Sequence, residues 1–186
     1  SPWPKAESGR SARDRVLVFA GRFVRVKNLP RLIRVFSAVV DHDWRLELIG
    51  EGPERQILES VIQNLGLNGR IAIRPPLAPD ELRRRIARAH AFVLPSLSDV
   101  SPNVILDCIA TGTPFLLTRE TGFYETLQDV GLFVDPMDED DSAAKLRMLL
   151  DPVAYASYRE RLAKFSRVHS WEHICDEWLD IIHATP

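Results

Sequence analysis

The chain has 186 residues, 45% of them hydrophobic, and a formal net charge of −2 at pH 7. This size and apolar content suffice for one domain with a core, and the small acidic excess argues against general nucleic-acid binding, which normally needs surplus basic residues. No apolar run approaches the roughly 20 residues that a membrane-spanning helix requires. The two cysteines lack metal-ligand spacing, so a reduced, cytoplasmic setting is expected.

The chain begins with Ser1 rather than Met, which suits a domain of a longer protein. Residues 1–14 are predicted to be a linker, because proline, glycine and serine interrupt any periodicity. Residues 15–186 are predicted to form one domain, in which short apolar runs alternate with amphipathic stretches. The runs predicted as buried strands are 16–20, 46–49, 71–73, 92–94, 115–117 and 132–134. The stretches predicted as helices are 29–40, 57–65, 79–89, 101–110 and most of 140–183.

Strands that alternate with helices, without hairpin signals, indicate parallel βαβ units. The predicted fold is therefore α/β: a Rossmann-like open parallel sheet of about six strands with helices on both faces. In such sheets ligands bind at the carboxyl ends of the strands, near helix N-termini. The loops that should carry function are thus 21–28, 50–54, 74–79, 95–103 and 118–125.

The first of these loops has the composition of an anion site. Gly21 directly follows a strand and allows close backbone approach. Arg22 offers a bidentate fork for phosphate oxygens, and Lys27 adds a point charge beside the next helix N-terminus. The alternative is that these cations are simply solvated.

Two other loops pair glycine with polar residues. Gly50 and Gly52 are small residues that a ligand could approach, or they form a tight turn. Gly122 lies shortly before Glu125, where backbone N–H groups could reach a ligand, or the acid is only a surface residue.

The loop at 95–103 is the most informative. Asp99 precedes the helix predicted to begin with a Ser101 cap, and Asp107 lies near the middle of that helix, so both carboxylates can face one cleft. Carboxylates accept hydrogen bonds from vicinal hydroxyls, and free N–H groups near Ser101 and Asn103 could hold phosphate. Asp107 stands among apolar residues, where a hydroxyl or a cation is the expected partner, whereas Asp99 alone also fits a cap or a surface acid.

In order and spacing these motifs resemble those of retaining glycosyltransferase family 4, the large group with the GT-B fold, over about residues 16–171. The matching motifs are Gly21-Arg22 with Lys27, Gly-x-Gly-Pro at 50–53, Pro95-Ser96, two acids with seven residues between them at Asp99 and Asp107, Gly-x-Pro at 112–114, and Gly122 before Glu125. The resemblance implies the C-terminal, donor-binding half of a GT-B enzyme.

The resemblance also implies a function: binding of a nucleotide-diphosphate sugar, whose sugar is transferred with retention to an acceptor hydroxyl in polysaccharide, glycolipid or glycoconjugate biosynthesis. Arg22 and Lys27 would neutralise the departing diphosphate, and Asp99 would face the donor sugar; these three are the catalytic candidates. Asp107 would bind ribose hydroxyls. The donor-binding candidates are Gly21, Gly50, Gly52, Ile73, Arg74, Pro75, Ser101, Asn103, Val104, Asp107, Gly122 and Glu125. No metal and no cofactor other than the donor substrate is expected.

The acceptor would sit largely on an N-terminal domain that this chain lacks, so we expect donor binding without efficient transfer by the chain alone. A cytoplasmic location is expected, with peripheral contact to the inner face of the membrane open to the full-length protein. Near the C-terminus an apolar stripe packs either on that other domain or on its own; it comprises Trp171, Ile174, Trp178, Ile181 and Ile182. A cluster of arginines forms either a solvated face or a contact for acidic lipid; it comprises Arg83, Arg84, Arg85 and Arg88.

This sequence departs from the family pattern at three positions. The family usually has Glu at both acidic positions, and often has Gly where Pro75 stands and Asp where His90 stands. Aspartate is one methylene shorter, and a misplacement of about 1 Å at a reacting group lowers a rate. Two alternatives therefore stay open: a non-catalytic partner or regulatory domain with the same fold, and a GT-B sugar epimerase.

Overall fold

A computed structural model describes residues 14–168. Most of the expected linker, the C-terminal apolar stripe and Cys175 lie outside the described residues. Within them the strands form one parallel sheet in the order β3-β2-β1-β4-β5-β6, as expected. The strands are β1 (Asp14–Ala20), β2 (Arg45–Ile49), β3 (Ile71–Arg74), β4 (Ala89–Leu94), β5 (Phe115–Thr118) and β6 (Leu132–Val134).

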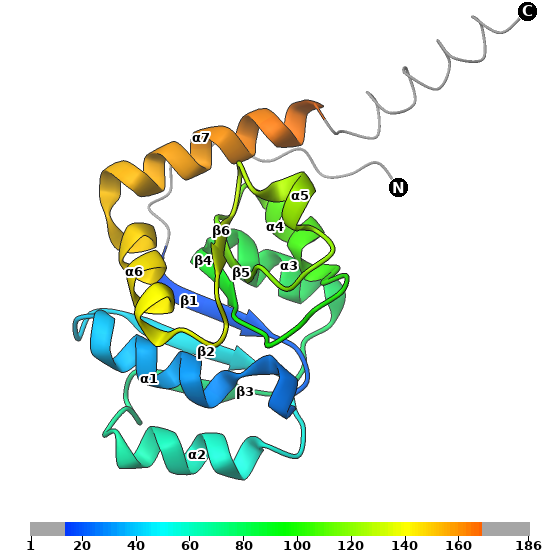
Figure 1. The fold of residues 1–186 in the computed structure, drawn as a ribbon. Coiled ribbons are helices and arrows are strands. Elements are labelled where there is room, and N and C mark those ends of the chain that lie inside the picture. The colour runs from blue at the N-terminus through cyan, green and yellow to red at the C-terminus, as the bar shows by residue number, and fades with distance from the viewer. Residues whose placement is uncertain (1–13, 169–186) are drawn as a thin grey trace, which may run out of the picture.

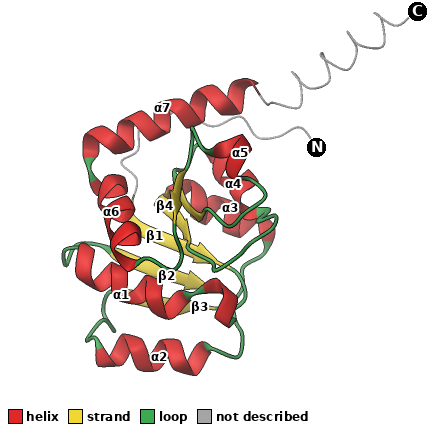
Figure 2. Cartoon of the chain, in the orientation of Figure 1, coloured by secondary structure: helices red, strands yellow, loops and turns green. Residues whose placement is uncertain are grey.

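Helices cover both faces of this sheet, as predicted (Figure 1, Figure 2). One face carries α1 (Leu29–Val39), α2 (Arg55–Asn64) and α6 (Glu139–Leu150). The other carries α3 (Pro79–Arg88), α4 (Val104–Thr111) and the short α5 (Tyr124–Leu127), and α7 (Pro152–Val168) packs against both α6 and α4. No helix in the described range is both long and apolar enough to span a membrane.

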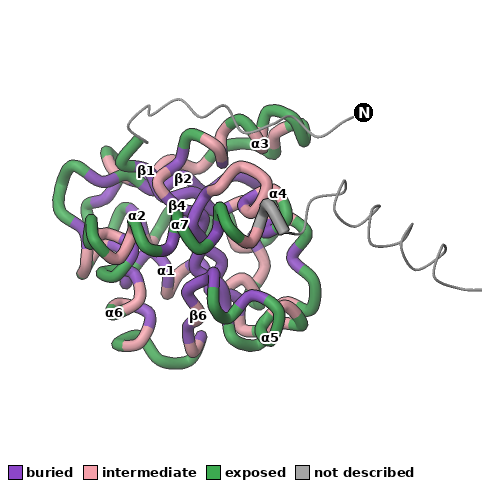
Figure 3. The backbone as a smooth tube through the Cα atoms, turned by 90° about the horizontal axis from the view of Figure 1, so that it is seen from above, coloured by how far each residue is buried: buried purple, intermediate pink, exposed green. Residues whose placement is uncertain are grey.

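The central strands are buried on both faces, which explains their continuous apolar sequence. Leu17, Val18 and Phe19 of β1 are fully buried, and Figure 3 shows buried residues in the interior with exposed residues on the outer sides of the helices. α1 contributes Ile33 and Phe36, also fully buried, at the spacing that places them on one helix face. The apolar patterning therefore determines both the sheet and the helix faces that cover it.

α4 begins later than its sequence indicates. Ser101 is exposed and caps nothing; the N-cap is Asn103, without a side-chain hydrogen bond. The reason is tertiary, since the loop before α4 is held by hydrogen bonds to other loops. Asp107 consequently lies in the first turn of the helix rather than near its middle.

Two short elements were not predicted from the sequence, because a single helical turn is too short to show apolar periodicity. These are α5 and the 3-10 turn η1 (Arg25–Lys27). The predicted C-terminal helical region is divided at Asp151, whose Oδ1 accepts the N–H groups of Val153 and Ala154 at the start of α7.

His90, at the start of β4, helps to hold α7 on the sheet. Its ring stacks on Tyr155 with centroids 3.9 Å apart and meets Trp44 edge-on at 4.6 Å. The Tyr155 hydroxyl donates to the His90 carbonyl oxygen at 2.8 Å. His90, one of the departures from the resemblance described above, therefore serves packing here.

A buried carboxylate joins β2, β3 and α3. Glu47 is 7% exposed, and its Oε1 and Oε2 accept hydrogen bonds from Arg74 Nε at 3.1 Å and Arg85 Nε at 2.5 Å. Arg85 also contacts Asp14 at 3.4 Å. Burial by itself raises the pKa of Glu47, but the hydrogen bonds and charges of Arg85 and Arg74 outweigh burial, and the pKa is lowered.

The arginines of α3 consequently do not form one solvated face. Arg85 belongs to the Glu47 cluster, and Arg83 pairs with Asp107 and Asp80. Arg84 and Arg88 are exposed. The expectation of a uniform basic face was wrong, because acids on neighbouring elements pair with two of its members.

The Glu47 cluster predicts acid-dependent stability. Its contribution is fully present above the ordinary glutamate pKa of 4.5 and is lost as pH falls through the lowered pKa. We expect Glu47→Gln to lower the free energy of unfolding by about 2 kcal/mol at pH 7, because two arginines lose a buried partner, and the difference from wild type to shrink below pH 4.5. Urea denaturation between pH 7 and pH 3 measures this.

Glu59→Gln is the matched control, since Glu59 forms an exposed pair with Arg55 within α2. It should change stability by less than about 0.5 kcal/mol. Equal stabilities of wild type and Glu47→Gln at pH 7, or a difference that does not vary with pH, would contradict the assigned role.

Candidate functional site

An open cleft of about 310 Å³ lies at the carboxyl ends of β1, β2 and β3. α3 and α4 contribute its remaining walls. It lies beside the point where the strand order reverses, between β1 and β4, which is where such sheets bind ligands. The lining residues are Ala20, Gly21, Arg22, Ile49, Gly50, Glu51, Pro76, Leu77, Leu82 and Val104.

The loops after β1 and β2 pack backbone against backbone at this cleft. The N–H of Gly21 donates to the Ile49 carbonyl at 3.0 Å, and that of Phe23 donates to the Glu51 carbonyl at 2.7 Å. A Cβ at position 50 would lie 1.9 Å from the Gly21 oxygen, and one at position 52 would lie 2.5 Å from the Phe23 oxygen.

Loop packing thus requires glycine at positions 50 and 52. Both also have φ values, +148° and +154°, that favour glycine. Gly50 lines the cleft as well, whereas Gly52 does not.

Arg22 lines the cleft and is exposed. Within residues 14–168 its side chain forms no hydrogen bond or ion pair. Its neighbours on both sides, Gly21 and Phe23, are fixed by the hydrogen bonds to the second loop. The guanidinium therefore extends from a rigid backbone and can bind an anion.

Lys27 and Asp99 lie together although 72 residues separate them in sequence. The Nζ of Lys27 lies 2.5 Å from Oδ2 of Asp99, with side chains that are 20% and 14% exposed. The Ser96 hydroxyl donates to the same carboxylate oxygen at 3.4 Å. Two of the three catalytic candidates thus form one partly buried ion pair, outside the cleft lining.

The loop that carries Asp99 is held from two sides. Leu97 N–H donates to the Val26 carbonyl at 2.7 Å, and Asp99 N–H donates to the Glu120 carbonyl at 2.9 Å. Gly122 N–H donates to the Val100 carbonyl, which would lie 2.8 Å from a Cβ at position 122. Gly122 thus permits the close approach of two loops, while Glu125 is exposed in the first turn of α5.

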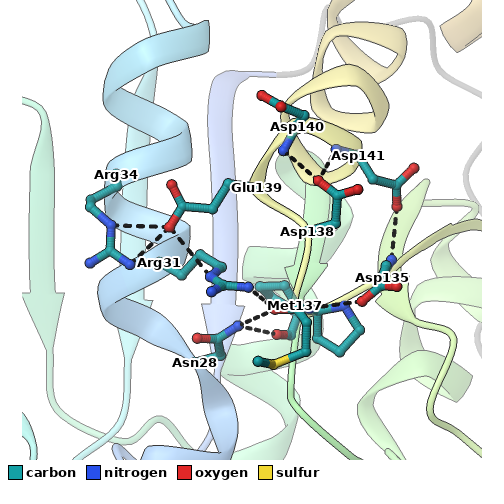
Figure 4. A network of polar contacts seen from close by, with 11 residues as sticks. Asn28, Arg31, Arg34, Asp135, Met137, Asp138, Glu139, Asp140 and Asp141 are labelled. Carbon is teal, nitrogen blue, oxygen red and sulfur yellow. Dashed lines mark hydrogen bonds and ion pairs between the residues drawn. The ribbon is translucent and has the colours of Figure 1, made fainter.

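Asn28 connects the first loop to two others, and this structural role was not predicted from the sequence. Its φ of +56° lies in the left-handed region, which asparagine tolerates. Figure 4 shows its amide facing the segment before α6, where Nδ2 donates to the Pro136 carbonyl at 3.0 Å and more weakly to that of Pro95. Arg31 Nη1 donates to the same Pro136 oxygen at 2.5 Å. An Asn directly before a Leu-Pro helix start was the available signal.

Asp107 has the cationic partner that its apolar neighbourhood predicted. Its Oδ1 accepts a hydrogen bond from Arg83 Nε at 2.9 Å, and the side chains are 23% and 29% exposed. The spacing of Arg83 and Asp107 in sequence gave no signal for this pair, which joins two helices.

The N-terminus of α4 faces the same cleft through Val104. Within the described part of the chain, the N–H groups of Asn103 and Val104 have no acceptor. Unpaired N–H groups at a helix start attract anions.

Four of the fifteen candidates line the cleft, namely Gly21, Arg22, Gly50 and Val104, and the other eleven lie outside its lining. β3 ends at Arg74, which pairs with Glu47, and Pro76 and Leu77 line the cleft instead of Ile73 to Pro75. Ser101 is exposed and also absent from the lining. Among residues 14–168, no three His, Cys, Asp or Glu side chains are grouped as metal ligands would be.

Comparison with known proteins matches residues 4–168 to the model of the family described as glycosyl transferases group 1. A D-inositol 3-phosphate glycosyltransferase of Nocardiopsis dassonvillei is 30% identical over 96% of this chain and 45% of its own length. The lipopolysaccharide core biosynthesis glycosyltransferase LpsE of Rhizobium meliloti is 32% identical over 92% of this chain and 50% of its own. The chain spans about half the length of the curated relatives it matches.

Solved structures show the same fold. The C-terminal domain of a glycosyl transferase group 1 family protein (LpcC) from Francisella tularensis aligns with a TM-score of 0.73 and 19% identity, over 83% of this chain and 85% of that one. The sucrose-phosphate synthase of Thermosynechococcus elongatus aligns with a TM-score of 0.75 and 22% identity, over 90% and 44% respectively.

The loop packing predicts that Gly50 tolerates no side chain. We expect Gly50→Ala to destabilise the fold by about 3 kcal/mol or more, because its Cβ would overlap the Gly21 carbonyl. Gly69→Ala is the control, since nothing lies within 4 Å of its added Cβ, and it should shift stability by no more than about 0.5 kcal/mol. Thermal and urea unfolding measure both; a Gly50→Ala protein as stable as Gly69→Ala would refute the packing requirement.

Proposed function

The chain belongs to the glycosyl transferases group 1 family, and on that premise we propose that it binds the nucleotide-diphosphate sugar of a retaining glycosyltransferase. The observation that carries the proposal is the cleft at the carboxyl ends of β1 and β2, into which the structure brings an exposed arginine and the start of a helix. An anion in this cleft would meet positive charge from two walls.

The diphosphate would lie between Arg22 and the N-terminus of α4. Arg22 offers two parallel N–H groups to phosphate oxygens. The N–H groups of Asn103 and Val104 provide further donors, and the helix dipole adds a partial positive charge. In the proposed reaction, negative charge grows on the departing diphosphate, so these fixed donors stabilise the transition state more than the ground state.

Lys27 and Asp99 would act at the sugar side of the same donor. Their ion pair holds the ammonium group in one place, beside the loop that leads into α4. Asp99 is shorter than the glutamate that the family usually has, yet it reaches Lys27 from its loop. In this proposal Lys27 supplies the second positive charge for the diphosphate, and Asp99 faces the sugar.

The nucleoside would occupy the apolar wall of the cleft. Ile49, Leu77 and Leu82 line it, together with the ring of Pro76. Apolar walls with few polar groups suit the flat face of a base. The proposed base contact therefore lies two residues further along the chain than the segment 73–75 favoured by the sequence.

A second domain would supply the acceptor. The chain spans about half the length of its curated relatives, and large apolar side chains are exposed on the segments after β4 and β6, at the edge that carries the cleft. These are Val100, 78% exposed, after β4, and Met137, 70% exposed, after β6. We propose that an N-terminal domain covers this edge, so that the chain alone binds donor without efficient transfer.

The class of acceptor follows from the relatives. One of them is named for lipopolysaccharide core biosynthesis, which favours a polysaccharide, glycolipid or glycoconjugate product. A lipid-linked acceptor would bring the full-length protein to the inner face of the membrane from the cytoplasm.

A non-catalytic partner domain of the same fold is the second candidate. The observation in its favour is that Asp99 and Asp107, the two motif acids, each already pair with a cation of the chain. Saturable binding of a nucleoside diphosphate separates the two, since only the donor-binding domain requires it.

The test uses isothermal titration of the chain with UDP, GDP and ADP. We expect one of them to bind saturably, Arg22→Ala to weaken it about tenfold, and Arg22→Ala with Lys27→Ala to weaken it further, because each change removes a charged hydrogen bond to phosphate. Arg25→Ala is the matched control: Arg25 is exposed in the same loop but outside the cleft, and its loss should leave affinity unchanged within about twofold.

Unchanged affinity in the double variant would overturn the phosphate roles of Arg22 and Lys27. Absence of saturable binding to all three nucleotides would favour the partner domain.

A further inference from the structure

Arg83 of α3 is held between two acids beside the cleft. Its Nε donates to Asp107 Oδ1 at 2.9 Å, and its Nη1 lies 3.4 Å from Asp80 Oδ1. Asp107 lies on α4, which packs against α3 on the same face of the sheet (Figure 1). Both members of the Arg83–Asp107 pair are about three-quarters buried, whereas the Asp80 side chain is 82% exposed. Asp107 is therefore the better shielded partner of the arginine.

The pair stands at the rim of the cleft. Leu82, which precedes Arg83, lines the cleft, and so does Val104, one helical turn before Asp107. Residues three apart on a helix share a face. The carboxylate of Asp107 is thus placed just beyond the cleft wall that α4 provides.

One oxygen of Asp107 remains available. Oδ1 accepts from Arg83, whereas no donor among the described residues bonds to Oδ2. The charged hydrogen bond from Arg83 Nε to Oδ1 restricts the rotation of the Asp107 side chain, which an unpaired aspartate would keep. A ligand that donates a hydrogen bond to Oδ2 then finds an acceptor that is already oriented. Less side-chain conformational entropy is therefore lost on binding.

We propose that Arg83 is a positioning residue that presents Oδ2 of Asp107 to the vicinal hydroxyls of the donor's ribose and so sets the preference for ribonucleotides. The assignment rests on the proposed donor binding. Arg83 need not touch the donor; it acts through the carboxylate that it orients.

The experiment compares, for the chain and its variants, the affinity for a nucleoside diphosphate with that for its 2′,3′-dideoxy analogue. Wild type should prefer the ribonucleotide about tenfold, as expected for hydrogen bonds to a charged group. Arg83→Ala should reduce this preference to about twofold by weakening ribonucleotide binding, while the affinity for the dideoxy analogue stays the same. A general loss of structure would weaken both ligands alike.

Two further variants complete the test. Arg84→Ala removes the exposed neighbouring arginine and should leave the preference intact. Arg83→Lys keeps the charge and most of the packing but not the Nε–H donor, so an intermediate preference is expected. If Arg83→Ala does not fold, the Arg83→Lys result tests the role of Arg83 instead.

The outcomes distinguish a failure of the role proposed for Arg83 from a failure of the proposed donor binding. If wild type binds the ribonucleotide and both Arg83 variants keep its full preference over the dideoxy form, Arg83 does not position Asp107, and donor binding itself still stands. A wild type that binds nucleotide without any ribose preference overturns the inference as well. A wild type that binds no nucleoside diphosphate overturns the proposed function first.

Discussion

The site depends on a direct backbone contact between the loops that follow β1 and β2. The Gly21 carbonyl occupies the space that a side chain at position 50 would need, and hydrogen bonds join the two loops on either side of that contact. Because the backbone around Arg22 is fixed in this way, its side chain is presented to the cleft from a rigid base. Preorganised donors of this kind need little rearrangement when an anion binds.

Several partly buried charges around the sheet are balanced by pairing. Three groups of ion pairs each join different elements and contain a carboxylate that is at most about one-quarter exposed. They are Lys27 with Asp99, Arg83 with Asp107, and Arg74 and Arg85 with Glu47. Such pairs stabilise mainly by avoiding the large penalty of an unpaired buried charge. Among the described residues that line the cleft, Arg22 remains a cation without a partner, which directs an anionic ligand to its position.

The sequence predicted the sheet well because strands buried on both faces leave a continuous apolar run, as in Phe92 to Leu94. It misplaced the start of α4, because Ser101 and Pro102 look like a cap and a first turn while loop contacts decide the conformation. Glycine at 50 was ambiguous, since a turn, a ligand or a second loop can each require it. The pairing of Asp107 with an arginine of α3 could not be derived, because it depends on how two helices pack.

Amide chemical shifts of the isotope-labelled chain, titrated with UDP, GDP and ADP, test donor binding at the cleft most directly. Saturable shifts should appear for one nucleotide and concentrate at Gly21, Arg22, Leu77, Asn103 and Val104, which surround the proposed diphosphate and base positions. Saturable shifts confined to residues away from the cleft, or no saturable shift with any of the three, would contradict the assignment of this cleft as the donor site.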